Sequence, residues 1–334
     1  MEVEKEKEKM KKKLMALILC MVIALGLTAC QMPSDGKRDA DNSDVTQSQT
    51  QSYEAKDITV AALKGPTAIG MVKLMEDSKE KKTANNYDFK IAASADEFSS
   101  LLIKGDVQIA ALPCNAAATL YNKSNGKIKV LGINTLGVLY IVEKGNTVQN
   151  VADLKGKTIA IPSVQSSQNI LINELLERNG MSKNDVNIIQ MSPTEMPFSL
   201  ASGAISGYCV AEPYGAVSIS KNFGKVLATS DELWNNSLCC ALVLNGNIRS
   251  DEKVTNELIE KYYRAAEQLE SEGSEETAGK FLGQETSVIE ESGKWINFKN
   301  LTVSKEEYDD LCNKLKKYGI NENPPSYEDF IYNP

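Results

Sequence analysis

A serine-rich loop between a predicted strand and a predicted helix is the stretch whose residue types most suggest chemistry. Residues 151–177 read VADLKGKTIAIPSVQSSQNILINELLE. The β-branched run at 157–161 predicts a buried strand, which ends at Pro162 because proline has no amide hydrogen for a ladder. Apolar spacing predicts a helix over 169–178. Backbone N–H groups at the start of that helix, with the hydroxyls of Ser166 and Ser167, would suit a small polar or anionic group.

The alternative for this loop is that Ser166 or Ser167 caps its own helix. The loop alone does not decide between the two interpretations, so the rest of the chain has to be weighed.

Composition excludes several classes of function. The chain has 334 residues with 42% hydrophobic content, enough to bury cores for about two domains. Its net charge of −8, with no basic stripe after residue 13, argues against a nucleic-acid partner. The sequence has no histidine, which excludes His-based triads and ordinary His-containing zinc sites. Seven cysteines occur without a C-x-x-C pair, so we expect no metal and no cofactor, and their pairing stays open.

The N-terminus has the pattern of an export signal. A charged segment, residues 1–13, precedes an apolar run at 14–27 that is too short to span a bilayer but suits a signal peptide. The run ends in Leu27-Thr28-Ala29-Cys30, which resembles a bacterial lipobox. We therefore expect a lipoprotein signal peptide over residues 1–30, lipidation at Cys30, and a disordered polar tether over 31–56. A plain cleaved signal or a membrane anchor is the alternative, and translation from Met1 or from Met10 stays open.

From Asp57 onward short strands alternate with helices, which predicts an α/β fold with parallel sheets flanked by helices. A first set of strand–helix units runs to about residue 138, and a second set begins near Val151. The apolar strand at 238–244 (LCCALVL) is expected to cross back to the first set. After Arg249 the pattern is helical, and no strand of comparable strength is predicted there.

Three segments resemble the solute-binding lipoproteins of ABC importers, in the branch that includes nitrate, sulfonate, taurine and thiamine-pyrimidine-precursor binders. They are LKGPT at 63–67, DLKGKTIAIPS at 153–163, and the stretch from Gly203 to YCVAEPY at 208–214. The resemblance implies a two-lobed type II periplasmic-binding-protein fold, each lobe a mostly parallel sheet flanked by helices, with a ligand cleft between the lobes. It places lobe one at 57–138 plus 242–334 and lobe two at 139–241.

The resemblance also implies ligand-binding positions where strand ends meet helix starts, and no catalytic or metal-binding residue. In lobe one these positions are Lys64, Gly65, Pro66, Thr67, Pro113, Cys114 and Asn115, with Asn134 and Thr135 nearer the hinge. In lobe two they are Ser163, Gln165, Ser166, Ser167, Gln168, Glu212 and Tyr214.

Each charged or amide candidate has a structural alternative. Lys64 would complement an anion or be a solvated turn lysine, and Asn115 would contact the ligand or cap its own helix. Glu212 would touch the solute, brace the hinge or close a helix turn. Tyr214 would offer a stacking face or pack between the lobes, and Phe198 and Tyr140 are expected in the core.

The charges favour an organic solute over a bare anion. None of the four arginines falls in a predicted site loop, so Lys64 and helix N-termini alone would balance an anion. Glu212 would favour an amine or an aminopyrimidine ring. We therefore expect a neutral or zwitterionic small solute.

The resulting functional hypothesis is an exported binding protein without enzymatic activity, anchored by lipid to the outer face of the bacterial cytoplasmic membrane. Its expected partners are a small-molecule solute, an ABC permease and its ATPase; we expect a monomer that contacts the membrane only through its lipid. The alternatives are an enzyme of the same fold, of the pyrimidine-precursor synthase or dehydratase type, and a sensory lipoprotein.

Overall fold

The computed structural model describes residues 53–145, 148–234, 237–246, 248, 251–268, 274–294, 296–301 and 303–332. The expected signal peptide, Cys30 and residues 31–52 of the expected tether lie outside the described residues, as do the side chains of Asn134 and Cys240. At the end of the expected tether, the Lys56 N–H donates to Asn85 Oδ1 and the Lys56 ammonium pairs with Asp251.

Six strands form the first sheet, in the order β11-β4-β10-β3-β1-β2. The strands β1, β3 and β10 are rich in apolar residues, and Val60, Ala61 and Ala62 in β1 have no exposed surface. β1 pairs in parallel with β2 and β3, whereas β10 runs antiparallel to β3 and β4, and β11 antiparallel to β4. The bounds are β1 (Asp57–Leu63), β2 (Asn86–Ala92), β3 (Ile109–Pro113), β4 (Ile128–Leu136), β10 (Leu238–Asn245) and β11 (Asn297–Leu301).

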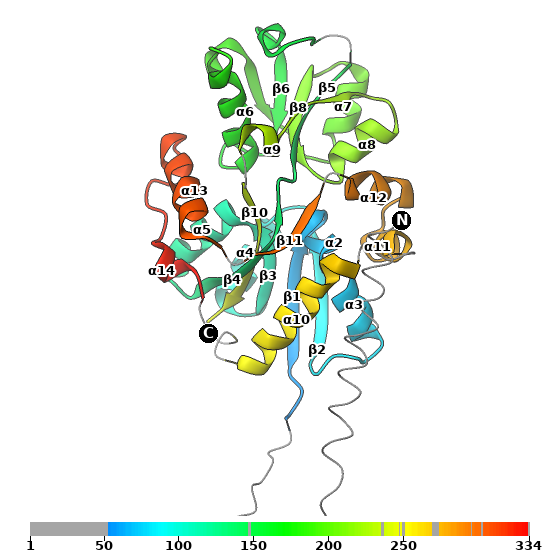
Figure 1. The fold of residues 1–334 in the computed structure, drawn as a ribbon, viewed down its shortest axis with the longest axis vertical. Coiled ribbons are helices and arrows are strands. Elements are labelled where there is room, and N and C mark those ends of the chain that lie inside the picture. The colour runs from blue at the N-terminus through cyan, green and yellow to red at the C-terminus, as the bar shows by residue number, and fades with distance from the viewer. Residues whose placement is uncertain are drawn as a thin grey trace, which may run out of the picture. The chain divides into compact units, whose positions relative to one another are not determined.

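Five strands form the second sheet, in the order β7-β6-β8-β5-β9. β6 pairs in parallel with β7 and β8, and β5 runs antiparallel to β8 and β9. The bounds are β5 (Leu139–Glu143), β6 (Thr158–Ile161), β7 (Asn187–Gln190), β8 (Gly207–Ala211) and β9 (Lys225–Thr229). We call the first sheet with the helices that cover it the first lobe, and the second sheet with its helices the second lobe (Figure 1).

The expected two-lobed α/β architecture is therefore confirmed, but the sheets are mixed rather than mostly parallel. The reason is the path of the chain between the lobes. A strand that carries the chain across, such as β5 or β10, enters its sheet from the edge facing the other lobe and so runs against its neighbours.

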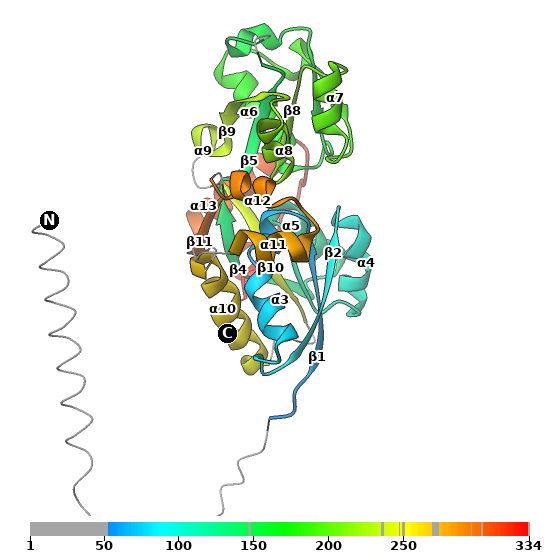
Figure 2. The same ribbon diagram turned by 90° about the vertical axis from the view of Figure 1, so that its right-hand side faces the viewer.

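Four helices from the first part of the chain belong to the first lobe. They are α2 (Pro66–Ile69), α3 (Val72–Lys79), α4 (Asp96–Lys104) and α5 (Cys114–Lys123). The second lobe carries α6 (Ser167–Arg178), α7 (Met196–Ser202) and α8 (Tyr214–Ser220), with 3₁₀ turns at η1 (Val151–Leu154) and η2 (Lys183–Asp185). The short α9 (Ser230–Leu233) precedes β10 (Figure 2).

After β10 the chain is mostly helical, as expected. The helices are α10 (Glu252–Gln268), α11 (Ser274–Leu282), α12 (Thr286–Gly293), α13 (Lys305–Lys317) and α14 (Tyr327–Phe330). β11 was not predicted from the sequence. Gly70 separates α2 from α3, since glycine weakens a helix interior.

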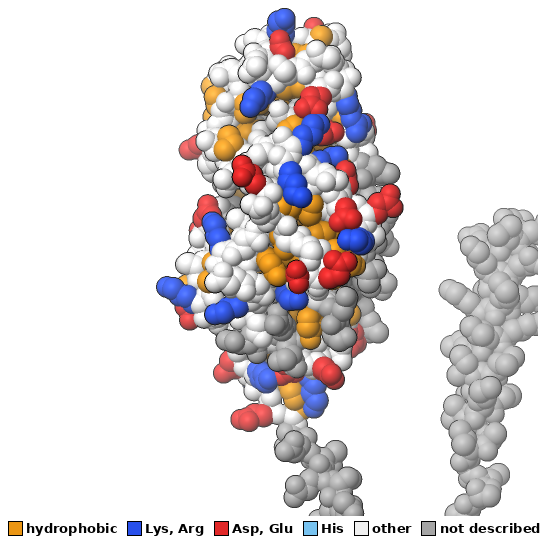
Figure 3. Space-filling model, turned by 90° about the vertical axis from the view of Figure 1, so that its left-hand side faces the viewer, with side chains coloured by type: hydrophobic (Ala, Val, Ile, Leu, Met, Phe, Trp, Pro, Cys, Tyr) orange, Lys and Arg blue, Asp and Glu red, His pale blue; other side chains and the backbone are white. Residues whose placement is uncertain are grey.

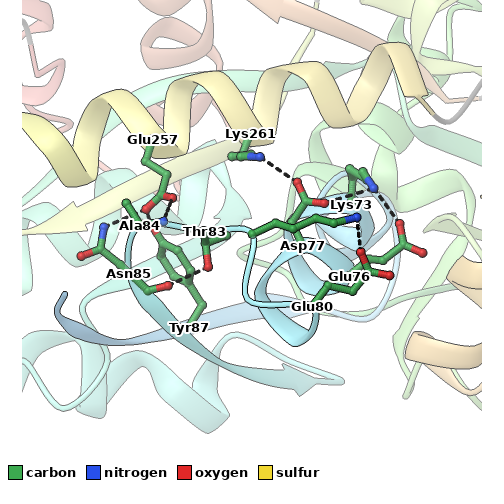
Figure 4. A network of polar contacts seen from close by, with 11 residues as sticks. Lys73, Glu76, Asp77, Glu80, Thr83, Ala84, Asn85, Tyr87, Glu257 and Lys261 are labelled. Atoms are coloured by element: carbon green, nitrogen blue, oxygen red, sulfur yellow. Dashed lines mark hydrogen bonds and ion pairs between the residues drawn. The ribbon is translucent and has the colours of Figure 1, made fainter.

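Two side chains of α10 fasten this helix to the first lobe (Figure 4). The Glu257 carboxylate accepts hydrogen bonds from the Ala84 N–H, Asn85 Nδ2 and the Tyr87 hydroxyl. The Lys261 ammonium lies 2.8 Å from an Asp77 oxygen. Burial alone would raise the pKa of Asp77, but Lys261 and Lys73 together hold that pKa below its usual value.

The chain passes from the first lobe to the second at Gly137 and returns through α9. Gly137 has φ +60°, and a Cβ built there would lie 1.9 Å from Asp231 Oδ1, so a larger residue would displace the returning segment. The two crossings therefore lie in contact at the hinge. No helix among the described residues has both the length and the apolar character needed to cross a membrane.

Candidate functional site

A cavity of about 780 Å³ lies between the lobes, at the edge where strands of both sheets end. The loops after β1, β3, β6 and β8 all reach it, as expected for α/β sheets whose ligands bind at carboxyl strand ends. Thirteen of the residues proposed from the sequence line this cavity: Lys64, Gly65, Pro66, Thr67, Pro113, Asn115, Ser163, Gln165, Ser166, Ser167, Gln168, Glu212 and Tyr214. Their contact with a ligand remains a prediction.

Three of the proposed residues do not line the cavity. Cys114 is buried at the first position of α5 and is not among the residues that line the cavity. Thr135 is fully buried within β4, so its side chain faces the protein interior. Asn134 also lies in β4, and its side chain is outside the described residues.

Asn115 makes two hydrogen bonds across the cleft. Its Nδ2 donates to the Gln165 carbonyl oxygen at 2.9 Å, and its Oδ1 accepts from the Ser167 hydroxyl at 2.9 Å. The N-cap of α5 is Pro113, without a side-chain cap, so the alternative that Asn115 caps its own helix is wrong. Asn115 belongs to the first lobe, and both of its partners belong to the second.

The hydroxyls of Ser166 and Ser167 do not cap α6, as the capping alternative would require. Ser166 is the N-cap of α6, but its hydroxyl donates back to the Ser163 carbonyl oxygen at 2.6 Å, and no side chain caps this helix. The Ser167 hydroxyl is bonded to Asn115. The backbone at the start of α6 therefore meets the cavity at Ser167 and Gln168 without a capping side chain.

Glu212 lies at the junction of the cavity and two helices. It is 2% exposed, and its Oε2 accepts hydrogen bonds from the Ala216 N–H at 2.9 Å and the Ser292 hydroxyl at 3.1 Å. The carboxylate thus closes the first turn of α8, as one of the structural alternatives expected, and it holds α12 rather than the hinge. Burial raises the pKa of Glu212 to about 7, and Glu291 adds to the rise, while the two hydrogen bonds oppose it.

Gly65 brings the backbone of the first lobe into contact with the backbone of Glu212. A Cβ built on Gly65 would lie 2.4 Å from the Glu212 carbonyl oxygen, and the φ of Gly65 is +153°. Only glycine permits this backbone approach, because any side chain would overlap the carbonyl. The backbones of the two lobes therefore touch at one wall of the cavity.

Three aromatic residues of the second lobe have different surroundings. Tyr140 is buried in β5, as expected, and burial with the charge of Glu212 raises its pKa. Tyr214 lines the cavity at the start of α8, and burial raises its pKa as well. Phe198 was expected in the core but is 62% exposed on α7, where it lies 6.3 Å from the Phe223 ring.

Charges of both signs surround the cavity. Lys64 and Lys123 supply positive charge, and Asp96, Glu97 and Glu212 supply negative charge. Glu97 Oε1 accepts from the Ala93 and Ser94 N–H groups, both at 2.9 Å, so this carboxylate already serves its own loop. The outer face drawn in Figure 3 likewise shows basic and acidic side chains interspersed.

Sequence reasoning missed two loops of the cavity. They follow β2 and β7 and contribute Ala93, Ser94, Ala95, Gln190, Met191, Ser192 and Pro193. The strand-end rule that selected the other loops would have found both, since each follows a parallel strand. The described residues contain no group of three or more His, Cys, Asp or Glu side chains that could hold a metal ion.

The comparisons with known proteins agree with this architecture. Residues 78–283 match the NMT1-like family. This chain belongs to that family. Among solved structures, it resembles the ligand-binding component of an ABC-type import system from Staphylococcus aureus, solved with zinc bound. The TM-score is 0.72 at 22% identity, covering 83% of this chain and 96% of that one.

Two further structures share the fold of this NMT1-like protein. The aliphatic sulphonate binding protein SsuA from Escherichia coli has a TM-score of 0.71 at 15% identity, covering 84% and 93% of the two chains. The nitrate-binding protein NrtA from Synechocystis has a TM-score of 0.65 at 14% identity, covering 83% and 84%. At these identities the likeness establishes the periplasmic-binding-protein fold, which confirms the fold expected from the sequence.

Curated relatives match shorter segments. The nitrate import ATP-binding protein NrtC of Synechocystis is 32% identical over 79 residues, 23% of this chain and 12% of that protein. A putative binding protein of Brucella abortus is 29% identical over 117 residues, 33% of this chain and 36% of that protein. The matched segment therefore spans much less than half of either relative.

Proposed function

We propose that this protein is the extracytoplasmic solute-binding component of an ABC importer. The observation that carries the proposal is the cavity between the lobes, which is lined by strand-end loops of both sheets. A solute bound there would contact both lobes at once, and such contact is how hinged two-lobed proteins enclose a ligand. The membership of the NMT1-like family and the likeness to the ligand-binding component, the sulphonate-binding protein and the nitrate-binding protein support the same role.

The proposed ligand is a small polar organic or anionic solute. The volume of about 780 Å³ falls in the range of about 300–1,000 Å³ typical of pockets for organic ligands. The uncapped start of α6 and the Lys64 side chain would favour a carboxylate, sulfonate or similar group. Glu212 is held in hydrogen bonds by Ala216 and Ser292, so it would present a weakly charged or neutral wall to the rest of the solute.

We propose binding without catalysis. The sequence has no histidine, and the buried carboxyl at the cavity is bonded to its own helices rather than placed beside a nucleophile. Cys239 also lines the cavity, but burial beside apolar strands does not activate a thiol. An enzyme of the same fold or a sensory lipoprotein remains the competing function.

The remaining parts of the proposal come from the sequence. They are export, lipidation at Cys30, a tether over residues 31–56, a monomeric state, and delivery of the solute to a permease with its ATPase. The expected lobes at 57–138 plus 242–334 and at 139–241 are kept with one change: because β10 (Leu238–Asn245) belongs to the first sheet, the second boundary moves from 242 to 238. Mass spectrometry of the membrane-extracted protein would test the lipid: a diacylated Cys30 is expected, and an unmodified chain would contradict it.

A thermal-shift screen of the full chain would test the binding role. The panel would hold nitrate, bicarbonate, taurine, alkanesulfonates, aminopyrimidines and amino acids, each followed by calorimetry where the melting temperature moves. A ligand that binds only the folded state stabilises it by about 2.7 kcal/mol at a hundredfold excess over its Kd. Substrate turnover without tight binding would favour the enzyme instead, and a shift abolished by Lys64→Ala would assign an anionic solute.

A further inference from the structure

The two lobes contact each other at the wall of the cavity through protein groups alone. The amide of Asn115 is 6% exposed, and the hydroxyl-bearing Ser167 is 8% exposed, so both lie away from bulk water. Asn115 uses its donor on the Gln165 carbonyl and its acceptor on the Ser167 hydroxyl, at 2.9 Å in each case. One side chain of the first lobe thus satisfies two polar groups of the second.

The chemistry of this contact requires an amide. A carboxylate would accept from Ser167 but would repel the Gln165 carbonyl oxygen, and an aliphatic side chain would do neither. Buried polar groups carry a free-energy cost when they lose their partners. Opening the lobes at this point would therefore exchange two buried hydrogen bonds for hydrogen bonds to water.

We propose that Asn115 is a positioning residue that latches the two lobes together, so that this contact, as well as any solute, sets the balance between open and closed cavity. The contact lies at the cavity wall and uses side chains other than Gly137 and Asp231, which meet where the chain crosses between the lobes. These hydrogen bonds join the two lobes and must break if the lobes separate there, whereas the chain crossings at the hinge persist in any arrangement of the lobes.

The latch also assigns roles within the serine-rich loop. The Ser167 hydroxyl hydrogen is used by Asn115, and the Ser166 hydroxyl hydrogen is used by Ser163 in its own loop. Ser167 therefore acts between lobes and Ser166 acts within one. The adjacent serines make a matched pair: removing either hydroxyl deletes one oxygen, but only Ser167→Ala removes a contact between lobes.

The test measures the lobe separation of the full chain in detergent, with no solute added. Fluorescent dyes on clickable non-natural residues at positions 104 and 183, which are exposed on α4 and η2 of different lobes, would report the separation by single-molecule energy transfer. We expect Ser167→Ala to raise the open-to-closed ratio roughly 2- to 10-fold, the value of one hydrogen bond, with Ser166→Ala unchanged. Asn115→Asp should raise the ratio further.

Equal ratios for Ser167→Ala and Ser166→Ala would overturn the proposal. A double-mutant cycle adds a second criterion, since Asn115→Ala and Ser167→Ala should not be additive if the two residues act through one contact. If the Asn115 variants fail to fold, the comparison of Ser167→Ala with Ser166→Ala still tests the proposal. Because no solute is present, this outcome is independent of the solute-binding function, which fails only if the ligand screen finds no binding.

Discussion

The Ser292 hydroxyl donates a hydrogen bond to Glu212 Oε2 at 3.1 Å, across 80 positions of the chain. Ser292 belongs to α12, which follows the return of the chain through β10, and Glu212 precedes α8 of the second lobe. α12 packs against α8, so this bond lies inside the contact between the two helices. A carboxyl that lines the cavity is therefore held by both the second lobe and the C-terminal part of the chain.

Glu212 should make the stability of the protein depend on pH. An unfolded glutamate loses its proton near pH 4.3, whereas the Glu212 pKa of about 7 keeps the proton in the folded state to higher pH. Between these values the folded state binds more protons, so the free energy of unfolding falls as pH rises, by roughly 3 kcal/mol in total. Glu212→Gln, which stays neutral, should remove most of this fall in urea unfolding measured from pH 4.5 to 8.

Ser292→Ala provides the control for that measurement. It removes one of the hydrogen bonds that lower the Glu212 pKa in the folded state, so the fall in stability should begin at the same pH but extend to higher pH. Parallel pH profiles for the natural protein and Glu212→Gln would show that Glu212 does not titrate in this window.

Gly65→Ala should separate the lobes. The new Cβ would lie 2.4 Å from the Glu212 carbonyl oxygen, too close for either backbone to stay in place. Gly156→Ala is the matched control, because Gly156 also has a positive φ, +73°, but nothing lies within 4 Å of its added Cβ. Both variants lose stability from backbone strain, by about 1–3 kcal/mol, but only Gly65→Ala should widen the distance between positions 104 and 183.

An unchanged distance in Gly65→Ala would mean that the loop around Gly65 yields instead of the lobes. Energy transfer between the same dye positions is again the measurement, with denaturant unfolding to confirm that both variants remain folded.

Much of the fold could be predicted from the sequence because it rests on local patterns. The run ITVAAL within β1 and the run TIAI of β6 are buried strands by composition alone, and a glycine or proline loop follows each. The strand-end rule then places loops such as Lys64–Thr67 and Ser163–Gln168 at one cavity. Both inferences need only short-range information.

The parts that were missed depend on distant partners. β11 contains Lys299 and Asn300 and becomes a strand by pairing with β4, which its own residues do not indicate. The bond between Asn115 and Ser167 joins residues 52 positions apart on different lobes, so it depends on how the lobes meet. Asn115 was therefore proposed as a ligand contact or a cap, and the contact between lobes could not be foreseen.

The attachment of α10 to the first lobe rests on Glu257 (Figure 4). Its carboxylate accepts from Asn85 Nδ2 at 2.7 Å, from the Tyr87 hydroxyl at 2.8 Å and from the Ala84 N–H. At this partly exposed site each hydrogen bond is expected to contribute about 1 kcal/mol net, and removing the acceptor leaves three donors without it. Glu257→Ala should therefore lower the free energy of unfolding by about 3 kcal/mol in urea denaturation.

Two variants make that prediction specific to the hydrogen bonds. Tyr87→Phe removes only one of the donors and should cost about 1 kcal/mol. Asn256→Ala changes the exposed neighbour of Glu257 on the same helix and should stay within about 0.5 kcal/mol of the natural protein. If Glu257→Ala were as mild as Asn256→Ala, α10 would be held by its apolar face alone, through residues such as Val254 and Leu258, which have no exposed surface.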